Sequence, residues 1–272
     1  MCDNSLAVRS CAAKALLATS VHDKPLALEL FQQLVDTDER LLATAYVQHF
    51  ICHHIHGHWA ALESCVRRML HSVEPEVREG GARLACLAAF DNECAGKLAE
   101  EAAAGDDAQR LGVARIASAN IGIASCRTWC EAQLRALFGD SCEEVRREAA
   151  LCFANLRGEP LADYEELFRG FIASPAFADG AFWILEVLEE STCRVPGVTC
   201  EVCAQFIERF GDEARDIRTR YAGDVGTVSK LLLRTYHQHQ DDEWGGHCLD
   251  LIDRMCLGAI PNITRSLNEI ER

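Results

Sequence analysis

Hydrophobic residues in this chain recur at the spacing of amphipathic helices. In the segment that begins at Val145, apolar side chains follow at Ala149, Cys152 and Phe153, positions i+4, i+7 and i+8 of one helix face. Ala, Leu, Glu and Arg are abundant and β-branched runs are few, so helical propensity is favourable along nearly the whole chain. The pattern predicts an all-α protein without strands.

A Val-Arg-x-x-Ala-Ala phrase occurs three times at nearly even spacing. The copies begin at Val8-Arg9, Val77-Arg78 and Val145-Arg146, which are 69 and 68 residues apart, and the middle copy has Gly81 in place of the first Ala. Weaker copies anchored on Leu41 and Leu111 divide these intervals into steps of 33 to 36 residues. Periods of this size are typical of helical solenoids. The sequence therefore predicts a right-handed α–α superhelix of stacked helix pairs.

Each predicted repeat holds two helices, and the second carries the Val-Arg phrase. Residues suited to helix capping precede these second helices, for example Asp36-Thr37-Asp38 and Asp140-Ser141-Cys142. We expect the Val to be buried and the Arg to lie over the helix end or to pair with an Asp of the adjacent repeat. The Ala pairs should let neighbouring helix axes come close.

The regularity of the repeats divides the chain into three predicted regions. Residues 1–190 form helical repeats, residues 191–227 form a loosened repeat with a loop at Thr192–Val198, and residues 228–272 form capping helices that end with an amphipathic segment at Ile260–Arg272. At the other end, Val8 begins a second helix with no partner helix before it. We expect this end to continue into, or pack on, another segment, or the chain to be a fragment.

Composition and charge narrow the classes of partner. Apolar residues make up 49% and charged residues 25%, as in ordinary globular proteins, and the formal charge is −15. This charge argues against nucleic acid, because backbone binders need clustered Lys and Arg. The 15 cysteines are scattered without a secretory segment, and no apolar stretch approaches the roughly 20 residues of a membrane helix. We therefore expect a cytoplasmic protein with free thiols.

The densest group of metal-competent side chains is a histidine-rich segment. Its candidates for metal ligands are His49, Cys52, His53 and His56, because 49/53 and 52/56 are i, i+4 pairs on a helix. The competing interpretation is that histidines at a helix end near Gly57 bind free carbonyls and complement the helix dipole. The competing interpretation is favoured, so no metal and no cofactor is predicted.

Three further groups of side chains have both a functional and a structural interpretation. Cys126 and Cys130 suit packing, whereas Cys200, in a C-x-x-C pair with Cys203 near a predicted helix start, suits a thiol with a lowered pKa. Adjacent carboxylates such as Glu165 and Glu166 diverge on a helix and suit exposed faces. In the tail, three histidines and two aspartates form a candidate site: His237, His239, His247, Asp250 and Asp253. The favoured alternative is that the two aspartates form structural ion pairs with Arg234 or Arg254.

The Val-Arg helices over about residues 4 to 190 resemble HEAT and armadillo-like repeats. The tail, Lys230-Leu-Leu-Leu-Arg234-Thr-Tyr236 followed by Asp250-Leu-Ile-Asp253-Arg254, resembles the carboxyl terminus of large bacterial proteins that join a NACHT or STAND-type NTPase to a HEAT-like array. The resemblance implies a sensor or scaffold arm in signalling or antiphage defence. The chain has no G-x-x-x-x-G-K-[ST] phosphate loop, so any nucleotide chemistry would belong to another segment.

Two functional hypotheses follow from the sequence. The first is a non-catalytic scaffold that binds protein partners along the concave face of the repeats. The alternative is a HEAT-like lyase or another small-ligand enzyme that holds its ligand in the groove of the solenoid. A deep pocket with convergent polar side chains would favour the enzyme, and a shallow face of mixed charge would favour the scaffold.

Overall fold

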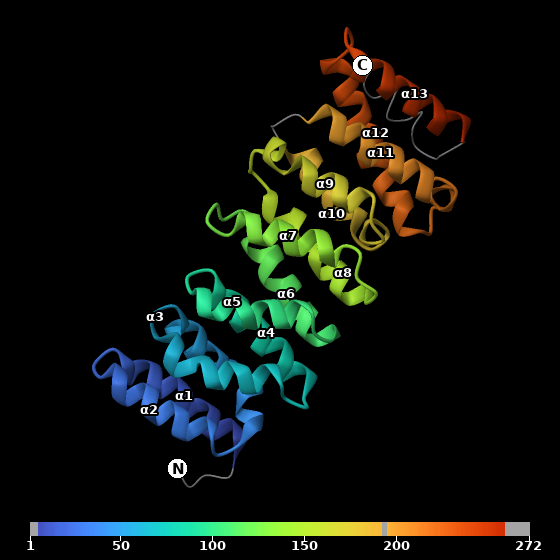
Figure 1. The fold of residues 1–272 in the computed structure, drawn as a ribbon. Helices are drawn as coiled ribbons and strands as arrows, with labels where there is room; N and C mark the ends of the chain where they lie inside the picture. The colour runs from blue at the N-terminus through green and yellow to red at the C-terminus, as the bar shows by residue number, and fades with distance from the viewer. Residues whose placement is uncertain (1–4, 192–194, 259–272) are drawn as a thin grey trace. The chain divides into compact units, whose positions relative to one another are not determined.

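A computed structural model of the chain describes residues 5–191 and 195–258, and these residues form helices connected by turns (Figure 1). The predicted all-α class is confirmed, since the described residues contain 13 α-helices and no strand. The chain divides into two compact units at Ile116 and Ala117. The predicted division at residues 190/191 and 227/228 stays a prediction, and Ile260–Arg272 lies outside the described residues.

Unit 1 is built from the first helices of the chain. In order they are α1 (Leu6–Ser20), α2 (Lys24–Val35), the 3-10 helix η1 (Glu39–Ala43), α3 (Ala45–Leu70), α4 (Pro75–Ala89) and α5 (Glu93–Ala103). Helix α6 (Asp107–Asn120) contains the boundary between the units. Helix α1 contacts α2 and α3, and α4 contacts α3 and α5, so the helices of this unit form a stack.

Unit 2 repeats this arrangement with shorter helices at its start. Its elements are α7 (Arg127–Leu137), α8 (Glu143–Ala150), η2 (Leu151–Leu156), η3 (Leu161–Tyr164), α9 (Glu165–Ile172), α10 (Ala176–Glu190), α11 (Pro196–Phe210), η4 (Glu213–Arg215), α12 (Arg220–Gln238) and α13 (Glu243–Leu257). Helices α8, α10 and α12 contact one another in succession, and so do α7, α9, α11 and α13. The unit therefore has two layers of helices, as stacked helix pairs would give.

The arginines of the Val-Arg phrase link neighbouring helices. Arg146 donates to the backbone carbonyls of Asp140 and Ser141, which precede its own helix, and its Nε lies 2.5 Å from Asp179 of α10. Arg78 behaves alike: it donates to the carbonyls of Ser72 and Val73 and lies 2.6 Å from Asp106. Arg9 pairs with Asp38 at 3.5 Å. Both expected roles of this arginine are thus present in one side chain.

The preceding valine fills the interior in two of the three copies. Val77 and Val145 are buried, whereas Val8 is 52% exposed because no described helix covers that face of α1. Leu16 of the same helix is nevertheless buried, since it faces the interior of the unit. One face of α1 is therefore exposed, and the face that carries Leu16 is buried.

The two weaker copies are anchored elsewhere than the sequence suggested. In α3, α4, α6 and α8, the side chain that bonds a backbone carbonyl ahead of the helix is the fourth residue of that helix, which selects Gln48 and Arg110 in place of positions near Leu41 and Leu111. Gln48 donates to the carbonyl of Leu42, and Arg110 donates to that of Gly105. The offset arises because η1 inserts a helical turn before α3 and because a polar residue, Gln109, takes the buried valine position before Arg110.

Small residues bring the helices of unit 1 close together. A Cβ atom added to Gly81 of α4 would lie 2.7 Å from the backbone nitrogen of Leu70 and 2.8 Å from Cβ of Met69, both in α3. Carbon atoms cannot approach so closely without displacement, so the position requires a residue without a side chain. The phrase uses Gly81 where the other copies have Ala because α3 lies directly against this turn.

Two long helices continue through an irregular or glycine-containing position. Helix α3 bends at His58 (φ −138°, ψ 35°) without ending there. Helix α12 runs from Arg220 through both Gly223 and Gly226. A Cβ at either glycine would meet nothing within 4 Å, so these residues cost some helical propensity but break no contact. In the described part of the chain, no helix is long and apolar enough to span a membrane.

Candidate functional site

The metal candidates of the histidine-rich segment point in different directions. His49 and Cys52 line a groove of about 350 Å³ against α4, whereas His53 lines a separate cleft against the α1–α2 turn. His56 forms an ion pair with Asp91, whose carboxylate lies 2.7 Å from Nδ1. Among the described residues, no group of three or more His, Cys, Asp or Glu side chains is placed to hold a metal ion.

His54, which was not a candidate, is the buried member of this segment. It is 4% exposed, its ring centroid lies 4.6 Å from that of Phe50 with the rings tilted by 56°, and its Nε2 has no hydrogen-bond partner. Burial lowers the pKa of His54 to about 4, with smaller contributions from the charges of His53, His58 and Lys24. The side chain is therefore neutral near pH 7 and serves as part of the core. Its position on the apolar stripe of the helix was the signal available in the sequence.

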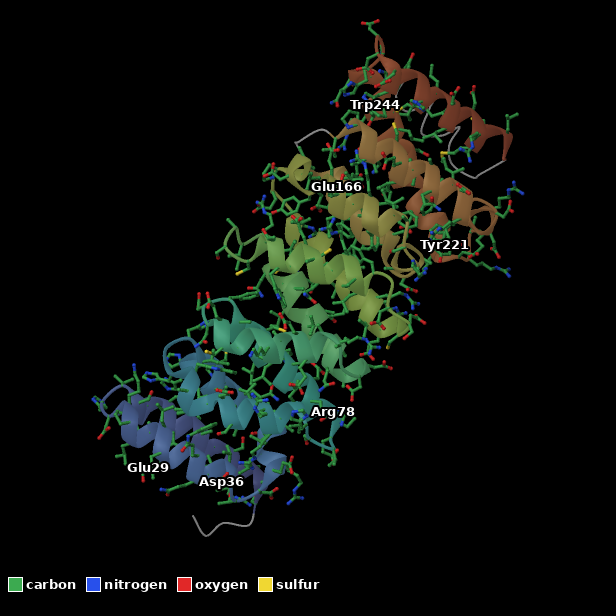
Figure 2. All side chains as sticks on the ribbon, viewed as in Figure 1. Glu29, Asp36, Arg78, Glu166, Tyr221 and Trp244 are labelled. Atoms are coloured by element: carbon green, nitrogen blue, oxygen red, sulfur yellow. The ribbon has the colours of Figure 1, made fainter. Side chains whose placement is uncertain are left out.

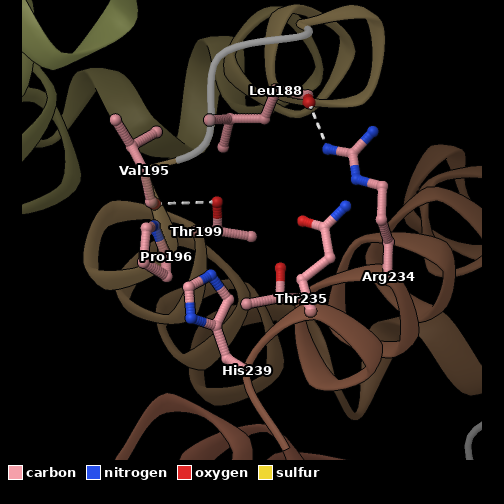
Figure 3. A pocket seen from close by; sticks show the side chains of 8 residues that line it. Leu188, Val195, Pro196, Thr199, Arg234, Thr235 and His239 are labelled. Atoms are coloured by element: carbon pink, nitrogen blue, oxygen red, sulfur yellow. Dashed lines mark hydrogen bonds between the residues drawn. The ribbon is translucent and has the colours of Figure 1, made fainter. Parts of the chain in front are cut away.

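The arginine of the tail motif caps another helix. Arg234 of α12 donates to the carbonyls of Leu188 and Glu189 at 2.6 and 2.7 Å, in the last turn of α10 (Figure 3). These carbonyls have no partner within their helix, so the guanidinium satisfies them. The adjoining cavity, between Arg234, Thr199 and His239, has about 10 Å³, room for about one water molecule. This place is structural, and neither Asp250 nor Asp253 reaches it.

Asp250 and Arg254 instead line a groove between α11 and α13. This groove, called here the α11–α13 groove, has a volume of about 550 Å³. Its residues come from one face of each helix, at steps of three and four: Gly197, Cys200, Glu201 and Ala204 from α11, and Trp244, His247, Asp250, Leu251 and Arg254 from α13. The exposed Asp253 is not among them.

The groove has an apolar floor and a charged rim. Cys200 and Leu251 are both 6% exposed and form the floor, whereas Glu201, His247 and Asp250 are exposed. The indole of Trp244, labelled in Figure 2, packs on Gly197 so closely that a Cβ there would lie 3.1 Å from the ring. An apolar centre with a polar rim is the usual anatomy of a surface that binds protein segments.

Acidic side chains predominate beside this groove. Arg169 of α9 pairs with Glu165 at 2.8 Å, Glu166 at 3.2 Å and Glu201 at 3.5 Å, so three carboxylates share one guanidinium. The Coulomb interaction with Glu201 is the main cause that raises the pKa of Arg169. Glu166, like Trp244, is labelled in Figure 2. The adjacent Glu165-Glu166 pair is thus an ion-pair partner and not a pair of convergent acids.

Trp244 is held in place by the start of its helix. Asp242 caps α13 by accepting a hydrogen bond from the Trp244 backbone N–H at 2.9 Å, and His239 Nδ1 lies 2.7 Å from the second oxygen of the carboxylate. The hydrogen bond with His239 is the main cause that lowers the pKa of Asp242. The candidate histidines of the tail are therefore separated: His239 supports the cap, His237 lies beside Gln240, and His247 lines the groove.

Two thiols meet beneath the groove. Sγ of Cys200 and Sγ of Cys248 are 3.6 Å apart and buried. The expectation of a lowered pKa at Cys200 is wrong, because α11 begins at Pro196 and Cys200, in its second turn, donates to Cys248, which raises the pKa of Cys200. The same hydrogen bond lowers the pKa of Cys248. Cys126 and Cys130 are buried in packing, as expected, and burial raises the pKa of Cys130 to about 12.

Comparison of the chain with protein-family models, with curated proteins and with solved structures found no match in any of the three. The functional argument therefore depends on the geometry of the α11–α13 groove and on the sequence itself.

Proposed function

We propose that this chain is a non-catalytic helical-repeat protein of HEAT-like solenoid architecture, and that it binds a segment of a protein partner in the α11–α13 groove. The observation that carries the proposal is the groove itself, with its floor of Cys200 and Leu251 and its charged rim. Grooves between helices bind amphipathic segments through apolar anchors on one face. Trp244 offers the largest such anchor surface, and large aromatics commonly dominate binding energy.

The dimensions of the groove suit a short segment. The lining residues of α13 extend from Trp244 to Arg254, ten helical steps of 1.5 Å or roughly 15 Å of helix. A partner helix of about three turns covers this length, as do about five residues of extended chain. The bound segment is therefore a short motif of a larger protein.

The charge of unit 2 favours a basic motif. Residues 117–272 contain 26 Asp and Glu against 16 Lys and Arg, and Glu165, Glu166 and Glu201 share Arg169 beside the groove. A motif that carries Lys or Arg next to an apolar anchor complements this rim. Because the rim is exposed, its contribution should appear mainly in the association rate and weaken with salt.

The lyase-like alternative receives less support from the described residues. An enzyme that acts on a small ligand usually encloses it in a pocket with convergent polar groups. The α11–α13 groove is open and its charged groups have mixed sign, while the cavity beside Arg234 is the size of one water molecule. These features support recognition of a protein segment.

The proposed role as the arm of a cytoplasmic, NTPase-linked signalling or defence protein in bacteria is supported by the resemblance of the tail alone. Translation of the DNA that adjoins the coding sequence tests it. An in-frame phosphate loop with further Val-Arg repeats would support the arm, and an unrelated gene would favour an independent adaptor.

Selection of peptides from a random displayed library tests the groove. We expect the full chain to enrich peptides with Lys or Arg beside an apolar residue, with dissociation constants that rise with salt. Trp244→Ala should weaken a selected peptide at least tenfold, and Glu201→Gln with Asp250→Asn should reduce the salt dependence.

Leu257→Ala is the matched control, because Leu257 is 87% exposed on the same helix and outside the groove. Selected peptides that bind Trp244→Ala as tightly as the unaltered chain would contradict the proposal. Circular dichroism should show equal helix content in all variants.

A further inference from the structure

We propose that Cys200 and Cys248 form a reversible disulfide, so that the chain carries an oxidation site that ties α11 to α13 beneath the groove. The two sulfur atoms are in contact at 3.6 Å, although 48 positions separate the residues in sequence. Helices α11 and α13 are neighbours in the same layer, and their packing brings the thiols together. A disulfide requires the sulfur atoms to approach to about 2.05 Å, a movement within the range of side-chain rotation.

The pair is distinct from the other thiols of unit 2. Cys203 is fully buried one turn after Cys200, and burial raises its pKa. Cys126 and Cys130 lie one turn apart at the start of a single helix, which holds their side chains in a fixed relation. The contact between Cys200 and Cys248 instead joins two different helices.

The geometry also provides access and a second sulfur. Cys200 lies in the floor of the groove at 6% exposure, so a small oxidant reaches this residue from the groove. Cys248 is fully buried, and its sulfur is in contact with that of Cys200. An oxidised Cys200 therefore lies beside the thiol that resolves it to a disulfide.

The reaction balances with hydrogen peroxide as the oxidant. The two S–H bonds break, one S–S bond forms, and the thiols together lose two electrons and two protons. Peroxide accepts these as its O–O bond breaks, giving two molecules of water. A dithiol reductant reverses the step by exchange.

Peptide mapping of the full chain tests the site directly. Reduced protein is treated with hydrogen peroxide at low protein concentration, alkylated and digested with trypsin without reduction. We expect peptides 195–209 and 235–254 to appear as one linked species, lighter than their sum by two hydrogens, which disappears after dithiothreitol. Peptides 128–135 and the one that ends at Arg127, which carry Cys130 and Cys126, should remain unlinked.

Variants identify the linked sulfur atoms. Peptide 195–209 contains both Cys200 and Cys203, so Cys203→Ala should retain the link and Cys200→Ala should abolish it. The thermal midpoint should rise on oxidation of the unaltered chain and stay unchanged in Cys200→Ala. Separate peptides with free thiols in the oxidised chain, or a link that persists in Cys200→Ala, would overturn the inference. Peptide mapping of the unaltered chain needs no variant. Neither the peptide mapping nor the thermal midpoint depends on whether the groove binds a peptide.

Discussion

At the scale of single residues, environment and not residue type decides what the histidines and cysteines of this chain do. Four of the five histidines between residues 49 and 58 are partly or fully exposed, whereas His54 alone is buried. The two thiols of the contact between α11 and α13 likewise differ in the direction of their pKa shifts because one donates to the other. Residue spacing identified these groups, but the exposed fraction of each side chain assigns their chemistry.

His54 makes the stability of the chain depend on pH in a defined window. Its pKa is lowered to about 4 in the folded chain from 6.5, so between these values the unfolded chain binds a proton that the folded chain does not. Stability is therefore present above pH 6.5 and is lost as pH falls towards 4, by on the order of 2–3 kcal/mol. Urea unfolding at pH 7 and pH 4.5, with and without His54→Leu, measures this loss.

The exposed neighbour provides the control for this experiment. His53→Leu removes a histidine from the same turn of α3 and should keep most of the pH dependence, whereas His54→Leu should remove it. An equal pH dependence in the His54→Leu variant and the unaltered chain would show that another group titrates in this window.

At the scale of elements, arginines at the fourth position of a helix join each helix to its loop and to its neighbour. Arg146 and Asp179 are 16% and 14% exposed, and the guanidinium also bonds two carbonyls. Gln48 takes the same place in α3 with a neutral amide. The repeat is therefore defined by a hydrogen-bond donor at a fixed helical position, and the sequence phrase is one way to provide it.

Arg146→Ala should destabilise unit 2 strongly. It leaves the carboxylate of Asp179 and two backbone carbonyls without their donor in a largely buried place, and the loss of one partner of such a pair costs about 3 kcal/mol. Guanidinium unfolding followed by circular dichroism measures the change in the free energy of unfolding.

Arg147→Ala is the matched control for this variant. Arg147 is the next residue and pairs with Glu143 on the surface, where both side chains are 59% exposed, so we expect a change below about 0.5 kcal/mol. Similar losses in the two variants would mean that the interior arginine has no special role.

At the scale of the whole molecule, each compact unit has its own stack of helices. In unit 1 other helices pack against α3 and α4, and in unit 2 other helices pack against α10 and α12. Unit 2 also contains a network of aromatic rings, in which the ring centroids of Phe171 and Phe177 are 5.7 Å apart. In repeat arrays, stability is a sum of local terms and contacts between neighbours. We therefore expect a disturbance in one unit to remain local.

Hydrogen exchange measured by mass spectrometry checks this expectation with Gly81→Val. The added side chain would collide with Leu70 and Met69, at a cost of about 1–3 kcal/mol. Backbone amides of α3 and α4 should exchange faster, and those of α10 and α12 should keep their rates.

Gly96→Ala is the control in the same unit. A Cβ at Gly96 meets nothing within 4 Å, so this change should slow exchange in α5 or leave it unchanged, with a gain of up to about 1 kcal/mol in helical propensity. Faster exchange in α10 and α12 after Gly81→Val would show that the two units unfold as one.

The sequence by itself determined the all-α class and most helix positions, and it offered the helix end or an Asp as alternative contacts of the Val-Arg arginine, because each depends on the period of one helix and on residues within one turn of its start. Only the tertiary structure decided which residues meet across helices. The inserted turn η1 moved the donor of the second copy to Gln48, the packing of α4 and of the α1–α2 turn on different sides of α3 separated the metal candidates, and the packing of α13 on α11 brought Cys200 against Cys248. The physical reason is that helix faces are encoded locally, whereas contacts between them depend on loop lengths and crossing geometry that no short pattern records. The superhelical arrangement of the repeats stays a prediction for the same reason.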